Sequence, residues 1–135
     1  MFEREKLIRF QHCDPAGIVF YPQYFVLFSE LVEDWFRDGL GVDFAELLTV
    51  RGLGIPMVRI ECDFLAPSKL GENLTLSLAV KKIGNGSLTL VISARSPAGE
   101  ERVRATLIVV LVSLVTRRPV PIPPDLRARI EPFQS

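Results

Sequence analysis

The segment from Pro22 to Asp38 has the sequence PQYFVLFSELVEDWFRD. Its charged side chains recur at the spacing i, i+3, i+4 and i+7, which places them in one stripe of a helix; they are Glu30, Glu33, Asp34 and Arg37. The other side chains are mostly apolar and cover a wider arc than the buried face of a surface helix. We therefore predict a long core helix that begins at Pro22, ends near Gly39 or Gly41 and is mostly surrounded by protein.

The sequence around this helix is typical of β-strands. Residues 2–10 have strand-like character, and a short helical piece is expected at residues 44–49. Alternating or continuous apolar patterns then predict strands at residues 57–65, 73–83, 87–95 and 101–115. The tripeptide Gly84-Asn85-Gly86 is typical of a hairpin turn, and the prolines between Pro119 and Pro124 predict an extended tail.

This order of elements predicts an α+β fold: one strand, a long buried helix, and four strands in an antiparallel meander that wraps the helix. The 135 residues are enough for one compact domain, residues 1–135, with a core that needs no disulfide or metal. The middle of the last strand, residues 107–112, is apolar on both faces. One helix cannot cover a whole sheet, so we expect its other face or edge to contact another subunit.

The composition excludes several classes of function. Sixteen Lys and Arg balance sixteen Asp and Glu, so no cationic excess is present to neutralise nucleic-acid phosphates. The longest apolar run is too short to span a bilayer, and the N-terminus lacks the features of a signal peptide, so a cytoplasmic location is expected. Cys13 and Cys62 form no Cys-x-x-Cys pair, which predicts free thiols and no metal site.

One carboxylate, Asp14, lies in largely apolar surroundings just before the long helix. In one interpretation it only starts a turn, accepting a backbone N–H while Pro15 fixes the next residue. In the other it acts on a ligand. If Pro22 is the first helical residue, Tyr21 is the N-cap and offers no capping side chain, so free N–H groups there are available to a ligand oxygen.

A carboxylate beside such an oxyanion hole can attack a carbonyl or activate a water when the leaving group departs easily. A thioester meets this condition, because a thiol with a pKa of about 8.5 leaves readily as thiolate. The sequence has no Gly-x-Ser-x-Gly motif, no Cys–His arrangement and no metal-ligand spacing, which are the usual signals of stronger hydrolytic chemistry.

The segment DPAGIVFYP, residues 14–22, followed by an aromatic-rich helix, resembles the signature of the 4-hydroxybenzoyl-CoA thioesterase family of the hotdog superfamily. Weaker similarity extends over nearly the whole chain. The resemblance implies a five-stranded antiparallel sheet around the helix, a homodimer or homotetramer with active sites between subunits, and no cofactor. It also implies that Asp14 is the catalytic nucleophile or general base, and that the backbone N–H of Tyr21 polarises the thioester carbonyl.

The expected substrate contacts are less specific. Gly17 belongs to the motif and is expected on the substrate side, and Met57 and Val58 are expected to line the acyl pocket from the neighbouring subunit, or else to be ordinary core strand. His12, the only histidine, lies two residues before Asp14 and is expected either to touch its carboxylate or to be hydrogen-bonded structure.

The family's basic cluster for the CoA phosphates has no counterpart in the hairpin Gly84–Gly86. Substitutes of the right charge are Lys81, Lys82, Arg117 and Arg118, although such residues are also typical of a solvated surface. An acyl group on a carrier protein therefore stays open beside acyl-CoA. The sequence predicts a cytoplasmic acyl-CoA thioesterase; a hotdog enoyl-thioester hydratase and a non-catalytic acyl-thioester-binding protein are the alternatives.

Overall fold

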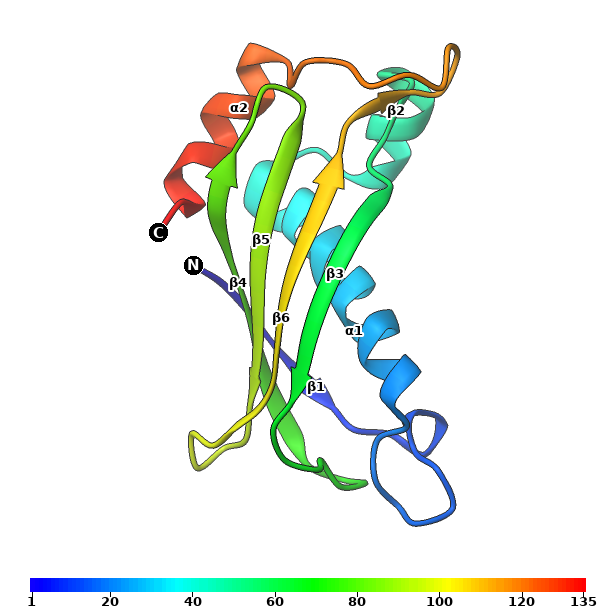
Figure 1. The fold of residues 1–135 in the computed structure, drawn as a ribbon, viewed down its shortest axis with the longest axis vertical. Helices are drawn as coiled ribbons and strands as arrows, with labels where there is room; N and C mark the ends of the chain where they lie inside the picture. Colours follow the sequence, from blue (N-terminus) through cyan, green and yellow to red (C-terminus); the bar gives the residue numbers. More distant parts are fainter.

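The computed structural model describes residues 1–135 and contains a five-stranded antiparallel sheet that curves around a long helix (Figure 1). The helices and strands in chain order are β1 (Phe2–Leu7), η1 (Phe10–His12), α1 (Tyr21–Asp34), η2 (Trp35–Leu40), η3 (Glu46–Val50), β2 (Leu53–Gly54), β3 (Met57–Phe64), β4 (Asn73–Ile83), β5 (Ser87–Arg95), β6 (Glu101–Val110), β7 (Val112–Ser113), α2 (Pro124–Ile130) and η4 (Glu131–Phe133).

The long helix is confirmed. The 14 residues of α1 continue directly into the six residues of η2, whose turns are π-helical. It ends at Gly41, which adopts a left-handed conformation with φ of +71°, as a helix-terminating glycine does. Its inner face is fully buried, but Phe25 and Val26 are 36% and 48% exposed, so one side of the helix faces solvent.

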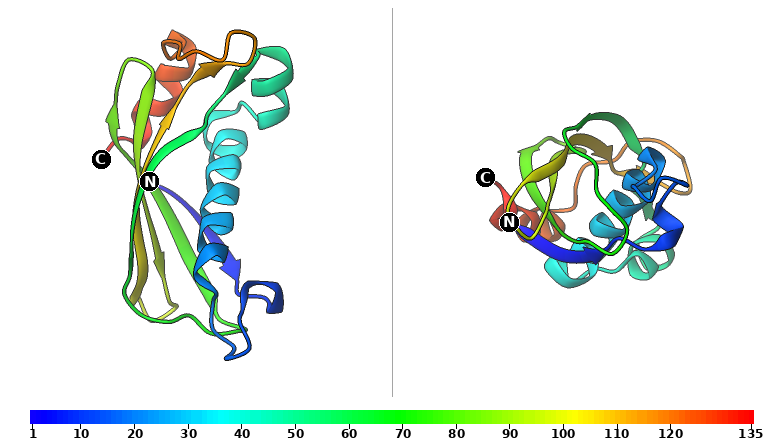
Figure 2. Two further views of the ribbon diagram at one scale, coloured as in Figure 1. Left: turned by 45° about the vertical axis from the view of Figure 1, so that its right-hand side comes forward. Right: turned by 90° about the horizontal axis from the view of Figure 1, so that it is seen from below.

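The sheet has the strand order β1-β4-β5-β6-β3, and α1 lies along its inner face (Figure 2). Alternate side chains of the three central strands point toward the helix and are buried, as the period of two requires. These residues are Leu74, Leu76, Leu78, Val80, Leu88, Leu90, Ile92, Ala94, Val103, Ala105, Leu107 and Val109. They form one continuous apolar core with the inner face of α1 and η2.

The predicted four-strand meander is wrong for β3. Strands β4, β5 and β6 follow one another as antiparallel neighbours, but β3 pairs with β6 at the far edge of the sheet. The chain therefore has to cross from β3 to β4 at the end of the sheet that carries the start of α1 (Figure 1). We call this connection, residues 65–72, the crossover.

The C-terminal part also differs from the sequence prediction. The strand expected at residues 101–115 leaves the sheet at Val110, because the chain turns to pair β7 with β2. The proline-rich segment is extended as far as Pro123, but Pro124 then begins α2, which buries Leu126 and Ile130 in the core. A proline is well suited to the first turn of a helix, where no backbone N–H is needed. None of the helices is both long and apolar enough to cross a membrane.

Candidate active site at the start of the long helix

Residues 13–20, which we call the Asp14 loop, form a tight hairpin-like turn before α1. Cys13 and Val19 are bridged as antiparallel partners, and Gly17 N–H donates to Asp14 C=O at 3.0 Å. Gly17 has φ of +76°, which a glycine adopts without strain. Asp at the first position, Pro at the second and a left-handed Gly at the fourth together account for this turn.

The Asp14 carboxylate is half-buried and uses one of its two oxygens in the turn. Oδ1 accepts the backbone N–H of Ala16 at 2.8 Å, whereas Oδ2 accepts no hydrogen bond from the chain. The turn role considered from the sequence is therefore present. It occupies only one oxygen, so the second remains available to an external group.

The start of α1 leaves one backbone donor free. Phe20 is the N-cap, with extended backbone and no capping side chain, so the helix begins one residue earlier than predicted. Pro22 has no N–H, and Gln23 N–H donates back to Phe20 C=O at 2.8 Å. The Tyr21 N–H donates to no loop or cap acceptor in the chain. This amide lies at the positive end of the helix dipole, where an oxygen carrying negative charge is stabilised.

An apolar pocket of about 300 Å³ lies beside Tyr21. The Asp14 loop, the first turn of α1, the end of β3 and the crossover all contribute to it. Its lining residues are Ile18, Val19, Tyr21, Tyr24, Phe64, Leu65, Ala66 and Pro67. The Phe64 ring meets that of Tyr21 edge to face at 6.2 Å and that of Tyr24 at 5.9 Å, so two of the walls are aromatic. Asp14 lies four residues before Ile18, the first lining residue, and is not itself part of the lining.

A buried polar network lies behind the pocket, and nothing in the sequence analysis predicted it. The Tyr24 hydroxyl donates to Ser68 Oγ at 2.9 Å, and the Arg102 guanidinium reaches the same oxygen at 3.3 Å. Arg102 also binds both carboxylate oxygens of Glu72, at 2.9 and 2.8 Å. This pairing, with the Lys69 N–H, lowers the pKa of Glu72 to about 2, and burial raises the pKa of Tyr24. The partners lie about 30 or more residues apart, so no local pattern reveals them.

His12 is buried and is not hydrogen-bonded to Asp14. Its Nδ1 accepts the Arg9 N–H at 2.8 Å. An accepting Nδ1 requires the neutral ring, and burial lowers the pKa of His12 accordingly. The geometry thus matches the structural role considered for this residue.

Five other predicted residues lie at the end of the folded molecule opposite to Asp14. Met57 and Val58 begin β3, whose far end carries Phe64. Lys81 and Lys82 lie near the end of β4, and Arg118 lies in the connection that precedes α2 (Figure 1). A single chain therefore does not bring these residues to the helix start.

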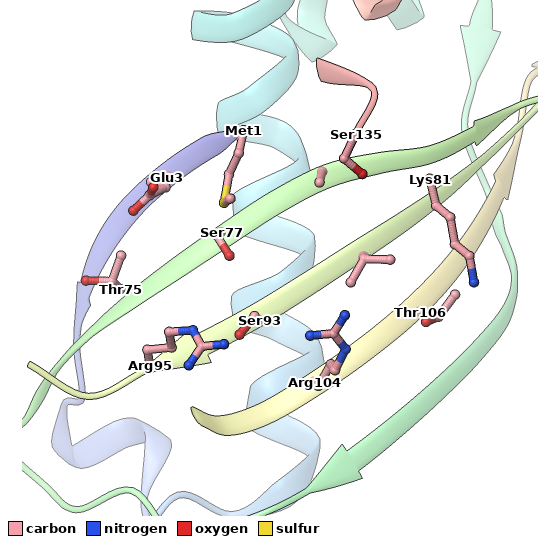
Figure 3. Close-up of a pocket in the computed structure, with 12 residues that line it drawn as sticks. Met1, Glu3, Thr75, Ser77, Lys81, Ser93, Arg95, Arg104, Thr106 and Ser135 are labelled. Atoms are coloured by element: carbon pink, nitrogen blue, oxygen red, sulfur yellow. The ribbon is translucent and has the colours of Figure 1, made fainter. Parts of the chain in front are cut away.

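Lys81 lines a separate hollow of about 660 Å³ on the outer face of the sheet (Figure 3). Ser93, Arg95 and Arg104 contribute to the same hollow. Both arginines lie 3.4 Å from the Glu101 carboxylate, which also accepts a hydrogen bond from Ser93 Oγ at 2.6 Å. Much of the positive charge here is thus already compensated within the chain.

Both cysteines are free thiols. Burial, with a smaller effect from Asp63, raises the pKa of Cys62 to about 11, so this thiol stays protonated at neutral pH. Burial and the neighbouring Asp14 also raise the pKa of Cys13. Neither thiol has the lowered pKa that a nucleophilic cysteine needs.

Comparisons with known proteins give similar sequences and structures among CoA thioesterases. A 1,4-dihydroxy-2-naphthoyl-CoA hydrolase from Acaryochloris marina is 26% identical over 123 residues, covering 90% of this chain and 89% of the relative. The structure of a 1,4-dihydroxy-2-naphthoyl-CoA thioesterase from Synechocystis has a TM-score of 0.87 at 22% identity, covering 96% of this chain and 94% of that one. A gentisyl-coenzyme A thioesterase has a TM-score of 0.84 at 24% identity, with coverages of 93% and 99%.

At these identities the two structures show that the folds are the same. The family model described as the Thioesterase-like superfamily matches residues 8–130, which is most of the chain. The chain therefore belongs to the Thioesterase-like superfamily, with the hotdog fold.

Proposed function

We propose that this chain, as one hotdog domain, is an acyl-CoA thioesterase that hydrolyses a thioester to a free acid and CoA. One observation carries the proposal: an apolar pocket lies beside Tyr21, whose N–H is unpaired, and seven residues earlier Asp14 has a carboxylate oxygen that accepts no hydrogen bond. Family membership and the CoA hydrolases among the relatives support the same reaction.

The proposed chemistry needs only these two groups and water. The thioester carbonyl oxygen accepts the Tyr21 N–H, which stabilises the negative charge that develops on it. Asp14 either attacks the carbonyl carbon or removes a proton from an attacking water. On either route the C–S bond breaks, and the thiolate departs and takes up a proton. If water attacks, the acid forms directly; if Asp14 attacks, the mixed anhydride that forms is hydrolysed by water, which releases the acid and restores the carboxylate. The Asx turn keeps Oδ1 engaged and so orients Oδ2.

We propose that the complete site forms between two subunits that pair through β3. This strand is an edge of the sheet, and its exposed side chains include Val58 and Phe64, at 59% and 50%. In an antiparallel pairing of two β3 strands, the start of one lies opposite the end of the other. The partner subunit's Met57 and Val58 would then approach Phe64 and complete the acyl pocket. A dimer is the smallest active unit in this proposal, and two such dimers would give a tetramer.

The same pairing would bring basic side chains of the partner subunit toward the substrate. Lys82 and Arg118 lie at the end of the folded molecule opposite to Asp14. A partner subunit that pairs in the antiparallel direction would therefore carry its own Lys82 and Arg118 toward Asp14 of this subunit. We assign them, with Lys81, to the CoA phosphates. For the acyl group we propose an aromatic acid, because Tyr21, Tyr24 and Phe64 provide ring faces and edges in the pocket. The names of two relatives, a 1,4-dihydroxy-2-naphthoyl-CoA hydrolase and a gentisyl-coenzyme A thioesterase, support this choice.

The test is release of free thiol from a panel of short, long and aromatic acyl-CoAs, with Asp14→Asn beside the parent. We expect the highest kcat/KM on an aromatic acyl-CoA and a loss of about 100-fold or more in Asp14→Asn. A crotonyl thioester in the panel tests for hydration, and an acylated carrier protein tests the other carrier. Asp14→Asn with full activity would remove the proposed mechanism, and binding without turnover by the parent would make the protein a non-catalytic thioester binder.

A further inference from the structure

The crossover forms one wall of the apolar pocket. Leu65, Ala66 and Pro67 line the pocket, and the next residue, Ser68, is 1% exposed. The crossover runs beside the Asp14 loop as a short antiparallel pair: Val19 N–H donates to Ser68 C=O and Leu70 N–H donates to Gly17 C=O, both at 2.9 Å. Whatever fixes the crossover therefore also fixes the loop that leads into Tyr21.

One side chain holds the crossover at several points. The Arg102 guanidinium donates to Pro67 C=O at 2.9 Å, to Ser68 Oγ at 3.3 Å and to both oxygens of Glu72. The backbone carbonyl of Arg102 also accepts the N–H groups of Leu65 and Ala66, at 2.9 and 3.2 Å. The Arg102 side chain is only 11% exposed, so these charged hydrogen bonds are largely shielded from solvent.

The network continues into the first turn of α1. Ser68 Oγ is shared between Arg102 and the hydroxyl of Tyr24, which is itself 4% exposed and lies three residues after Tyr21. A continuous set of hydrogen bonds thus joins Glu72, Arg102, Ser68 and Tyr24. It ties the start of β6 to the crossover, and the crossover to the start of the helix.

We propose that Arg102 is a positioning residue of the thioesterase site: it holds the crossover against the Asp14 loop and thereby sets the width of the acyl pocket and the placement of the Tyr21 N–H. The inference rests on the proposed function. Arg102 contacts no reacting atom and acts through Ser68 and the crossover. The low pKa of Glu72 agrees with a pairing that stays charged throughout the neutral range.

The test compares Arg102→Gln with Arg104→Gln. Arg104 lies two residues along the same strand face, but it is exposed and pairs only with Glu101. The main readout is the ratio of kcat/KM for benzoyl-CoA to that for acetyl-CoA. This ratio does not depend on the fraction of folded enzyme, so a purely structural role leaves it unchanged. We expect Arg102→Gln to change the ratio by about 5-fold or more and to lower kcat by about 10- to 100-fold.

Arg104→Gln should match the parent, and Arg102→Lys should recover part of the loss. Glu72→Gln should have a smaller effect, and adding it to Arg102→Gln should change little further, because the two side chains act as one unit. A ratio that is unchanged in Arg102→Gln would overturn the proposal, as would a double variant in which the two losses multiply.

Hydrogen exchange gives a readout that needs no activity. In Arg102→Gln, the amides of Val19 and Leu70 should exchange about 10-fold faster or more, while amides in the centre of β5 keep the parent's rates. Unchanged exchange at both amides would overturn the proposal that Arg102 holds the crossover against the Asp14 loop, whatever the kinetics show. If the parent cleaved no thioester, the proposed function would fail separately, and the exchange measurement would still decide whether Arg102 holds the loop.

Discussion

The two carboxylate oxygens of Asp14 differ in their hydrogen bonding. Oδ1 closes the turn with the Ala16 N–H, while Oδ2 is free for the proposed chemistry. The sequence could predict both roles, because Asp-Pro-x-Gly is a turn pattern and the residue lies just before an uncapped helix. It could not predict that the turn would leave the second oxygen without a hydrogen bond, since this depends on where each oxygen points.

Two substitutions of Asp14 distinguish its hydrogen bond in the turn from its proposed part in hydrolysis. Asn keeps an oxygen that can accept the Ala16 N–H, so Asp14→Asn should change the free energy of unfolding by less than about 0.5 kcal/mol. Ala removes this acceptor, so Asp14→Ala should cost about 1 kcal/mol. Both should lose hydrolysis to a similar extent. Urea denaturation measures the stabilities, and a stability loss in Asp14→Asn as large as that in Asp14→Ala would contradict the division of roles.

His12 should make the stability depend on pH near neutrality. Burial lowers its pKa in the folded chain, so the unfolded chain binds more protons as the pH falls below about 6.5, and the free energy of unfolding should decrease. Denaturation between about pH 7.5 and 5.5 measures this slope. His12→Asn offers an acceptor to Arg9 N–H but does not titrate, so its slope should be flatter. Equal slopes would show that His12 is not the group responsible.

At the scale of elements, sequence patterns predicted the helices and strands whose formation depends on neighbouring residues in the chain. The long helix, the strands β4 and β5 and the hairpin between them all agree with the sequence analysis, because their periodicity and turn residues are local. The pairing of β3 with β6 was missed, since a strand's neighbour depends on the path of the whole crossover. Helix α2 was missed because its prolines suggested an extended tail, although they end where the helix begins.

The hairpin between β4 and β5 contains a matched pair of glycines. A Cβ on Gly86 would lie 2.6 Å from the Val120 carbonyl oxygen, which belongs to the backbone and cannot rotate away. A Cβ on Gly84 would meet Ser87 Oγ at 2.5 Å, and this hydroxyl can turn aside. We expect Gly86→Ala to cost about 1–3 kcal/mol of stability and Gly84→Ala clearly less. Thermal unfolding of the two variants checks the order, and the reverse order would contradict this packing of the hairpin.

At the scale of the whole molecule, the residues proposed for the site lie at two opposite ends of the folded subunit. Asp14 and Tyr21 lie at the end where α1 begins, and Val58 and Arg118 lie at the other (Figure 1). The sequence resemblance predicted a site between subunits. The fold, with β3 as a free edge, supports that proposal.

A charge on the β3 edge should separate the subunits. We expect Val58→Arg to sediment as a monomer at micromolar concentration and to lose most of its thioesterase activity, although Asp14 is intact. Val50→Arg is the control, because Val50 is 78% exposed on η3, outside the sheet. It should keep the parent's assembly and activity. A fully active Val58→Arg monomer would show that one chain contains the whole site.

The central claim is that the Tyr21 amide binds the thioester oxygen while the Asp14 carboxylate faces the acyl carbon. The most direct measurement is a crystal structure of Asp14→Asn with intact benzoyl-CoA bound. We predict a distance of about 2.7–3.2 Å from the thioester oxygen to the Tyr21 nitrogen, with the substituted side chain at position 14 next to the acyl carbon. A thioester bound away from the start of α1, with its oxygen on other donors, would contradict the account.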